Sequence, residues 1–474
     1  MDTNAFRRIG HELIDWVADY RERIETLPVM SCAKPGDVRA KIPKEPPQKG
    51  VGLEGLGKTL DEVVMPGITH WTHPGFFGYF PSNTDLASVL GDLVASGLGV
   101  QGMSWVTSPA ATEVEEAVMG WLRQMLGLSE SFSGVIHDTA STATFCALLC
   151  ARERATGFSQ NRGGMQAEVS PLTVYASDQA HSSVPKGALL AGFGREYLRL
   201  IETDKDHAMR IDLLEAAIQA DLDAGRRPCA LVAAIGTTAT TGLDPLAKMA
   251  ELAKRHSLWL HVDAAMAGTA MTCPEYRWMW EGIEHADSIV TNPHKWMGVG
   301  FDLTAYFVKD PQHLIRVMGT DPSYLRTAFD AEVNNFRDWG IPLGRRFRSL
   351  KLWFLILDRG VEAIQELVRR NVSYAAWLAA QIDSAPNWQR MGPAHLQTVS
   401  LRHVPSGMAT DEDALSAHNL AIADAINAGG RQFVTTAMVK GQRLIRASIG
   451  AQATEMRHVE GLWEALQKAA AETK

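Results

Sequence analysis

The sequence lacks several features that would place it in a specialised class of protein. It has no run of eighteen apolar residues, so we expect no membrane-spanning helix. Its N-terminal residues contain no apolar stretch followed by a small-residue cleavage site, so no secretory signal is expected. A net charge of -8 leaves no basic excess for binding nucleic acid. Five cysteines without a CxxC pair favour free thiols in a reducing compartment. A cytoplasmic protein without a metal site is therefore expected.

The sequence does have the length and patterning of a globular protein with more than one compact unit. A chain of 474 residues is long enough for two or three such units. Apolar residues recur at three- and four-residue spacing from Phe6 to Ile24, which predicts an amphipathic helix. The apolar stripe of such a helix must pack against this chain or another one. Residues 41–50, rich in proline and charge, read as an extended connector.

From about Ser133 onward, short strand patterns alternate with helical segments. Strands are predicted at 172–177, 229–235, 258–264, 288–292 and 303–308, and helices at 211–225 and 246–256. Apolar strands separated by helices indicate an α/β fold with a mostly parallel sheet that is covered on both faces. A long helix is predicted after Arg345, followed by a smaller α+β region. The expected domains are an N-terminal arm (1–82), a large domain (83–350) and a small C-terminal domain (351–474).

One glycine-rich segment imitates a nucleotide-binding motif. GVGLEGLGKT, residues 50–59, contains both GxGxxG and the P-loop pattern GxxxxGK[ST]. Both motifs need a buried strand directly before the glycines, so that the phosphate meets a helix N-terminus at a sheet edge. The preceding residues are PKEPPQK, which cannot form a central strand. We therefore interpret this segment as a connector.

Two segments contain polar residues that would suit an anionic, aromatic ligand. Thr139–Thr142 precede a strongly helical run, and hydroxyl residues at a helix start can bind a phosphate. Ordinary N-capping is the more common role of such residues. His181 follows the predicted strand 172–177 in SDQAHSS. A lone histidine at such a position is more often a structural hydrogen-bonding group than a catalyst.

Two further segments contribute a carboxylate and a lysine. Asp263 ends a predicted strand, which places it at the carboxyl edge of the sheet, although it could equally cap the next helix. Lys295 follows another strand among apolar neighbours, where loss of its proton would make it a nucleophile, whereas most loop lysines are simply solvated. A phosphate site, a carboxylate, an imidazole and an activated lysine together are what pyridoxal phosphate requires.

The same segments resemble a known family. HVDAAMAG, NPHKW, SDQAHSS and IPLGRRFRSLK are similar to motifs of the aromatic-L-amino-acid decarboxylases, which act on Dopa, tryptophan or tyrosine, and bacterial Dopa decarboxylases look closest. THWTHPGFFGYFPS and SWVTSPAATEVE extend the resemblance over nearly the whole chain. It implies a pyridoxal-phosphate enzyme of fold type I with a seven-stranded, mostly parallel sheet. It also implies a homodimer in which the N-terminal arms wrap around the partner and the active site lies at the subunit interface.

The resemblance assigns roles to matching positions. Lys295 would be the Schiff-base lysine, Asp263 would pair with the pyridine nitrogen, His181 would stack on one face of the ring, and Ala265 would cover the other. Other cofactor-site positions would be Ala140, Ser141, Thr238, Asn292 and His294. The substrate pocket would include Trp71, Tyr79, Phe80, Pro81, Ser82, Gly344 and, from the other subunit, Met103.

Tyr324 and Gly344 bear on the reaction and on the substrate. Tyr324 matches the tyrosine that donates a proton to Cα, and relatives with phenylalanine there tend to be aldehyde synthases. Gly344 leaves room for an indole, whereas Ser82 could hydrogen-bond a phenol or catechol. Overlapping activity on Dopa, tryptophan, 5-hydroxytryptophan, tyrosine and phenylalanine is expected, with Dopa or tryptophan first. The alternatives are an aromatic acetaldehyde synthase and a non-catalytic pyridoxal-phosphate binder.

Overall fold

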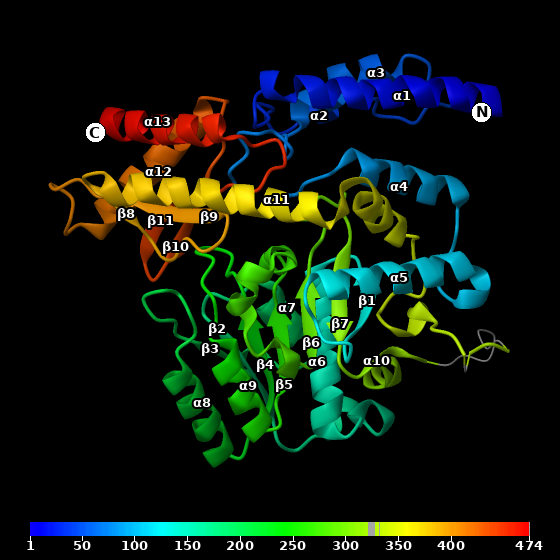
Figure 1. The fold of residues 1–474 in the computed structure, drawn as a ribbon, viewed down its shortest axis with the longest axis vertical. Helices are drawn as coiled ribbons and strands as arrows, with labels where there is room; N and C mark the ends of the chain where they lie inside the picture. The colour runs from blue at the N-terminus through cyan, green and yellow to red at the C-terminus, as the bar shows by residue number, and fades with distance from the viewer. Residues whose placement is uncertain (321–327, 331, 474) are drawn as a thin grey trace. The chain divides into compact units, whose positions relative to one another are not determined.

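The structure is a computed structural model that describes residues 1–320, 328–330 and 332–473 (Figure 1). The chain divides into two compact units. The first consists of Met1–Pro81, Pro386–Trp388 and Arg402–Lys474, and the second of Ser82–Ala385 and Gln389–Leu401. The sequence-based division into an arm, a large domain and a small domain stays a prediction.

The second unit is built on a seven-stranded sheet with the order β1-β7-β6-β5-β4-β2-β3. Neighbouring strands from β3 to β6 pair in parallel, whereas β7 is antiparallel to both β6 and β1. Because β7 opposes both neighbours, β1 runs in the same direction as β6, and the two strands end at the same edge. The strands are β1 (Ser133–His137), β2 (Leu172–Ser177), β3 (Leu198–Ile201), β4 (Arg227–Ala234), β5 (Trp259–Asp263), β6 (Ser288–Thr291) and β7 (Thr304–Val308).

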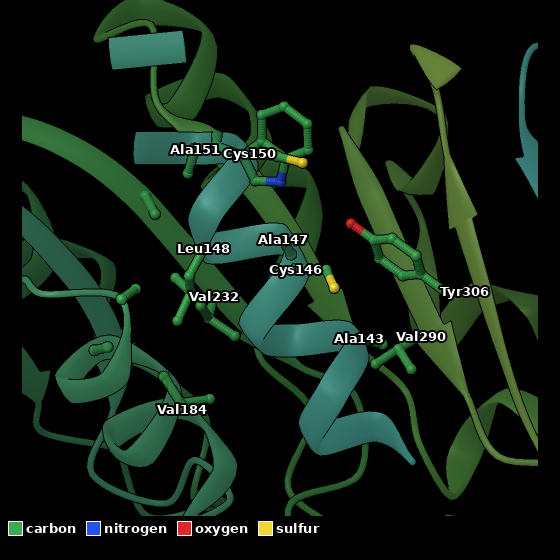
Figure 2. Close-up of a cluster of buried hydrophobic side chains, with 14 of the residues drawn as sticks. Ala143, Cys146, Ala147, Leu148, Cys150, Ala151, Val184, Val232, Val290 and Tyr306 are labelled. Atoms are coloured by element: carbon green, nitrogen blue, oxygen red, sulfur yellow. The ribbon is translucent and has the colours of Figure 1, made fainter. Parts of the chain in front are cut away.

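Helix α6 packs across this sheet and forms the centre of its core. It contacts β1, β4, β5, β6 and β7. Small residues on its buried face, among them Ala143, Cys146 and Ala147, let the helix lie close to Val290 and Tyr306 on the strands (Figure 2). The helices of this unit are α4 (Leu86–Leu98), α5 (Pro109–Met125), α6 (Ala140–Thr156), α7 (Ser183–Leu190), α8 (Ile211–Asp223), α9 (Leu246–Arg255), α10 (Pro311–Met318) and α11 (Ser349–Ser384).

The first unit contains the two ends of the chain. Its helices are α1 (Thr3–Arg23), α2 (Asp37–Ala40), α3 (Leu56–Thr59), α12 (Glu412–Ala428) and α13 (Met456–Glu472). In this unit β10 (Thr435–Val439) and β11 (Gln442–Ser448) pair in a smaller sheet of order β10-β11-β9-β8, whose other strands, β8 (Trp388–Arg390) and β9 (Thr398–His403), include residues of the second unit. Helix α12 packs against β11 and α13. Of the predicted N-terminal stripe, Ile9 and Ile24 are buried, whereas Phe6 is 61% exposed.

The predicted fold class is confirmed, and the elements agree with the sequence within a few residues. The seven-stranded sheet includes β1 and β3, which the strand patterns alone did not identify. The glycine-rich segment behaves as a connector: α3 spans four residues behind a left-handed Gly55, and no strand precedes it. Within the described part of the chain, none of the helices combines the length and apolarity needed to cross a bilayer.

Candidate active site at the carboxyl edge of the large sheet

The parallel strands end beside one another, and the predicted site residues lie at or just after those ends. Asp263 is the last residue of β5 and is paired in register with Ala234 of β4 and Val290 of β6. His181 follows β2, Thr238 follows β4, and Asn292–Lys295 follow β6. Because β1 runs in the same direction as β6, the N-terminus of α6 lies at this edge as well. Side chains far apart in the sequence thus come to one edge, where open α/β sheets bind ligands.

Asp263 is fixed within the sheet and only 9% exposed. One carboxylate oxygen accepts a hydrogen bond from the N–H of Ala265 at 3.0 Å. The backbone carbonyl of Asp263 accepts from the N–H of Ile235 at 2.9 Å. Ala265 is also tied to the next turn, because its carbonyl accepts from the N–H of Asn292 at 2.8 Å. A buried carboxylate with a rigid backbone is therefore held next to the turn that bears the lysine.

His181 responds electrostatically to both Asp263 and Lys295. Burial lowers the pKa of His181, the Asp263 carboxylate raises it, and the Lys295 ammonium lowers it. The side chain is exposed by surface area, yet the protein packed around it is dense enough to disfavour the charged form. Nδ1 accepts from the Ser183 N–H at 3.1 Å and lies 2.9 Å from the Ser183 hydroxyl. Nε2 therefore bears the proton of the neutral ring.

The turn after β6 is held by hydrogen bonds on both sides of Lys295. Asn292 accepts the Thr304 hydroxyl at 2.7 Å, and its carbonyl accepts the N–H of Lys295 at 2.9 Å. The carbonyl of Lys295 in turn accepts the N–H of Asn83 at 3.2 Å. Nδ1 of His294 lies 2.7 Å from the Leu303 carbonyl oxygen. Burial is the main cause that lowers the pKa of His294 to about 4, so this ring is neutral.

The start of α6 has the geometry of an anion site. Thr139 is the N-cap, and its side chain accepts from the N–H of Thr142. Ala140 is buried and Ser141 is exposed. First-turn N–H groups have no partner within the helix, and the helix dipole adds positive potential there. Thr238 is exposed in the loop after β4.

Trp71, Tyr79, Phe80 and Pro81 belong to the first unit and form an aromatic cluster of their own. The rings of Trp71 and Tyr79 stack with centroids 5.4 Å apart. The guanidinium carbon of Arg446 lies 4.4 Å from the Phe80 ring centroid, and an N–H of Arg446 donates to the Tyr79 carbonyl. Trp71 is 39% and Tyr79 54% exposed, which is unusual for residues with so much apolar surface. The cluster thus offers a partly open aromatic surface.

The remaining predicted substrate positions lie in the second unit. Ser82 is partly buried at its start. Met103 is also partly buried, and its carbonyl accepts from the N–H of Arg337 at 2.9 Å. Gly344 is exposed, and a Cβ built there would lie 3.4 Å from Nε2 of Gln101. A serine at position 344 would therefore contact Gln101. Tyr324 lies outside the described residues.

A buried ion pair and a buried lysine were not recognised in the sequence. Glu115 and Arg345 form an ion pair at 2.6 Å with side chains only 3% and 9% exposed. Lys351 is 1% exposed, and its ammonium donates to the carbonyls of Gly300 and Asp302 at 3.0 and 2.9 Å. Glu115 lies in SWVTSPAATEVE, and Arg345 and Lys351 lie in IPLGRRFRSLK. Both motifs also supported the family resemblance, and that was the sequence signal for these residues. No group of three or more His, Cys, Asp or Glu side chains in the described parts of the chain is arranged to hold a metal ion.

Comparison with known proteins agrees with this arrangement. Residues 35–403 match the model of the pyridoxal-dependent decarboxylase conserved domain. Phenylacetaldehyde synthase of Arabidopsis thaliana is 38% identical over 483 residues, covering 99% of this chain and 96% of that protein. Tryptophan decarboxylase 2 of Oryza sativa subsp. japonica is 37% identical over 477 residues, covering 98% and 95%.

Solved structures give the same relationship. The crystal structure of Oryza sativa TDC with PLP and tryptamine superposes with a TM-score of 0.95 at 34% identity, covering 100% of this chain and 99% of that one. Catharanthus roseus tryptophan decarboxylase in complex with L-tryptophan has a TM-score of 0.92 at 34% identity, with 100% and 99% covered. With the family model, these relatives and this fold in agreement, the chain belongs to the pyridoxal-dependent decarboxylases, in the aromatic-amino-acid decarboxylase family.

Proposed function

We propose that this protein removes the carboxyl group of aromatic L-amino acids, giving the arylalkylamine and carbon dioxide, with pyridoxal phosphate bound at the carboxyl edge of the large sheet. The observation that supports this most directly is the placement of Asp263, His181 and Lys295 at or just after the ends of parallel strands of one sheet, where open α/β folds bind ligands. At one sheet edge, a carboxylate could pair with the pyridine nitrogen of the cofactor and an amine with its aldehyde. A neutral imidazole could lie against one face of the same ring. Family membership adds the reaction class.

The residues at this edge fit pyridoxal phosphate in chemistry. The phosphate would be held by the first-turn N–H groups of α6, with Ala140 and Ser141, and by Asn292 and His294 after β6. The pyridine nitrogen would meet Asp263, the aldehyde would meet Lys295, and His181 and Ala265 would lie against the ring faces. Thr238 would stand near the Asp263 end of the ring. The site thus has groups that bind an anion at the phosphate end and a carboxylate at the pyridine end. This matches the cofactor, which has a negative phosphate at one end and a protonated ring nitrogen at the other.

In the proposed mechanism the cofactor would supply an electron sink for the bond that breaks at Cα. Asp263 would keep the pyridine nitrogen protonated, because its carboxylate would stabilise the adjacent positive charge. Lys295 would supply the amine nucleophile that holds the aldehyde end of the cofactor and would assist release of the product. Tyr324, outside the described residues, is proposed to donate the proton to Cα. The Ser183 contacts engage Nδ1 of His181. The Nε2–H on the other side of the imidazole is therefore available to donate a hydrogen bond to a ligand.

The substrate side chain is proposed to be recognised by the aromatic cluster together with Ser82, Gly344 and the partner's Met103. Dopa, tryptophan and 5-hydroxytryptophan are the favoured substrates, with tyrosine and phenylalanine as weaker ones. An apolar pocket separates similar rings by only modest factors. Gly344 supports the larger indole, because a side chain there would approach Gln101. Glutamate is disfavoured because residues 69–82 are largely apolar and aromatic and include no lysine or arginine for a second carboxylate.

We also propose that the protein works as a cytoplasmic homodimer with the active site at the subunit interface. Helix α4 presents five exposed apolar side chains at helical spacing. They are Leu86, Leu90, Leu93, Val94 and Leu98, with Leu98 60% exposed. A monomer in solution at micromolar concentration would contradict this part of the proposal. No nucleic-acid or membrane partner is proposed.

A second candidate is an aromatic acetaldehyde synthase, since phenylacetaldehyde synthases are among the relatives. Tyr324 favours simple decarboxylation. The experiment that separates the two is a panel of aromatic amino acids with the purified protein and added pyridoxal phosphate, in which amine, carbon dioxide, aldehyde and peroxide are measured. Equal amounts of amine and carbon dioxide, absent in Lys295→Ala, are expected. Aldehyde with peroxide from the native protein would establish the synthase instead, and cofactor binding without turnover would leave a binder.

A further inference from the structure

A column of buried polar side chains joins β5 and β6 to α6 below the proposed cofactor site. The Trp259 indole N–H donates to the Ser288 hydroxyl at 2.9 Å. The Ser288 hydroxyl lies 2.9 Å from Nδ1 of His261, and Nε2 of His261 lies 3.3 Å from the Thr144 hydroxyl. None of the four side chains is more than 2% exposed. The catalytic assignments above use none of them.

Strand alternation aligns this column with Asp263. Residues two apart in a strand point to the same face, so Trp259, His261 and Asp263 share one face of β5. His261 is in register with Ser288 on β6, which explains why its ring reaches that hydroxyl. The Asp263 carboxylate acts on the pKa of His261 directly, so the two side chains are electrostatic neighbours. The strand that presents Asp263 to the site therefore also presents the histidine that reaches α6.

Thr144 lies one turn beyond the residues proposed to bind phosphate. It is four residues after Ala140, the first residue of α6. The other end of the same helix is also anchored, because Arg154 forms two hydrogen bonds to Asp287, at 2.6 and 3.2 Å, and stacks over the Trp259 ring. Between these two points the buried face of α6 is apolar and made mostly of alanines and cysteines, with Leu148 among them (Figure 2). The Thr144–His261 contact is thus a side-chain link between the second turn of α6 and β5, in addition to the Thr304 hydroxyl, which donates to the Asp138 carbonyl just before the helix at 3.2 Å.

His261 is suited to this link only as a neutral ring. Burial lowers its pKa to about 4, so that both ring nitrogens are not protonated together. Trp259 can only donate, hence Ser288 accepts from it. When the Ser288 hydroxyl donates to Nδ1, Nε2–H donates to Thr144, and the donors of Trp259, Ser288 and His261 are each used once.

We infer that His261 is a positioning residue: through Thr144 it sets the place of the α6 N-terminus relative to Asp263, and thereby the phosphate end of the cofactor site relative to its ring end. This rests on the cofactor placement proposed above. An axial displacement of the helix by one residue is about 1.5 Å, which is enough to break N–H contacts with a phosphate while leaving the ring contacts in place. The link should therefore matter for the phosphate group and little for the pyridine ring.

Two ligands separate these contributions. Pyridoxal and pyridoxal phosphate differ only in the phosphate, and equilibrium dialysis of the cofactor-free, full-length protein gives a dissociation constant for each. Thr144→Val replaces the hydroxyl by a methyl group of similar size, whereas Thr144→Ser keeps the hydroxyl and removes a methyl group. Thr144→Val should weaken pyridoxal phosphate about 3- to 10-fold, the range for one lost buried hydrogen bond, and leave pyridoxal within about twofold. Thr144→Ser should retain native binding of both ligands.

His261→Phe tests the other side of the same contact. It should weaken pyridoxal phosphate selectively, and the double variant with Thr144→Val should be no worse than His261→Phe alone, because one link is removed twice. Equal weakening of both ligands, or additive losses in the double variant, would overturn the inference. Unchanged binding in Thr144→Val would overturn it as well. If the native protein itself binds pyridoxal as tightly as pyridoxal phosphate, the proposed phosphate site at α6 is wrong, and that failure is recognised before any variant is compared.

Discussion

Removing Glu115 should destabilise the protein more than almost any other single change at a polar residue. Glu115, on α5, and Arg345 form a buried ion pair at 2.6 Å. The same carboxylate accepts the N–H of Ile136 at 2.8 Å, and the same guanidinium donates to the Ile136 carbonyl at 2.8 Å. β1 is an edge strand, so Glu115 and Arg345 pair the backbone groups that no further strand pairs.

The size of the effect follows from what Glu115→Ala leaves behind. Arg345 would stay buried without its counter-charge, and the N–H of Ile136 would lose its acceptor. Breaking a buried pair by deleting one partner typically costs about 3–5 kcal/mol. Glu115→Gln keeps an acceptor for Ile136 and loses only the charge, so about 1–3 kcal/mol is expected. Urea unfolding followed by tryptophan fluorescence, at fixed protein concentration, measures both.

The ranking of the variants is the sharper test. Alanine should be clearly worse than glutamine, and Glu115→Leu combined with Arg345→Met should recover much of the loss, because it removes both charges together. A loss below about 1 kcal/mol for Glu115→Ala would refute the reasoning, since solvent or another partner would then have replaced the carboxylate. Equal losses for alanine and glutamine would assign the whole effect to the charge and none to the edge strand.

Three further predictions concern packing, a buried cation and acid. Gly91→Ala should lower the melting temperature strongly, because the new Cβ would lie 2.7 Å from the Leu350 carbonyl oxygen where α4 meets α11. Lys351→Met should lose about 1.5–3 kcal/mol in urea unfolding by freeing two loop carbonyls, and arginine should not restore it fully. His261 has a pKa of about 4 in the fold against about 6.5 when unfolded, so unfolding takes up a proton between these values and stability falls with falling pH. His261→Phe should flatten that fall by about 1.4 kcal/mol per pH unit, and an unchanged slope would contradict it.

The central strands could be predicted from sequence because they are apolar on both faces. β2 has the predicted bounds, and β4, β5, β6 and β7 differ from the prediction by one or two residues at an end. The strands that were not identified, β1 and β3, are the two ends of the sheet. SGVIH and LRLI are short and include polar residues, since an edge strand is covered less completely. The strand pattern of β1 and β3 is therefore weak because these strands lie at the edges of the sheet.

The candidate site was accessible to sequence reasoning where each residue sits next to a strand end. Placing Asp263 and Lys295 at the sheet edge needed only a strand assignment and the rule that parallel strands share an edge, whereas their roles came from the family resemblance and stay predictions. Glu115 and Arg345 are separated by 230 residues, and Thr144 and His261 by 117. No local pattern connects such pairs. A buried, charged or polar side chain within a core segment is the signal that could have marked them, because it must find a partner somewhere in the fold.

Strand β5, which contains His261, has several polar side chains within one core segment. WLHVD places an indole N–H, an imidazole and a carboxylate at alternate positions, so all three face α6. The carboxylate is at the strand end, where a ligand can reach it, whereas the imidazole and indole lie deeper, where only the protein can satisfy them. Burial makes the deeper ring neutral and keeps it within the hydrogen-bonded column. The five residues of WLHVD thus supply, by alternation, a carboxylate at the sheet edge and the two polar side chains that bond to Ser288 and Thr144.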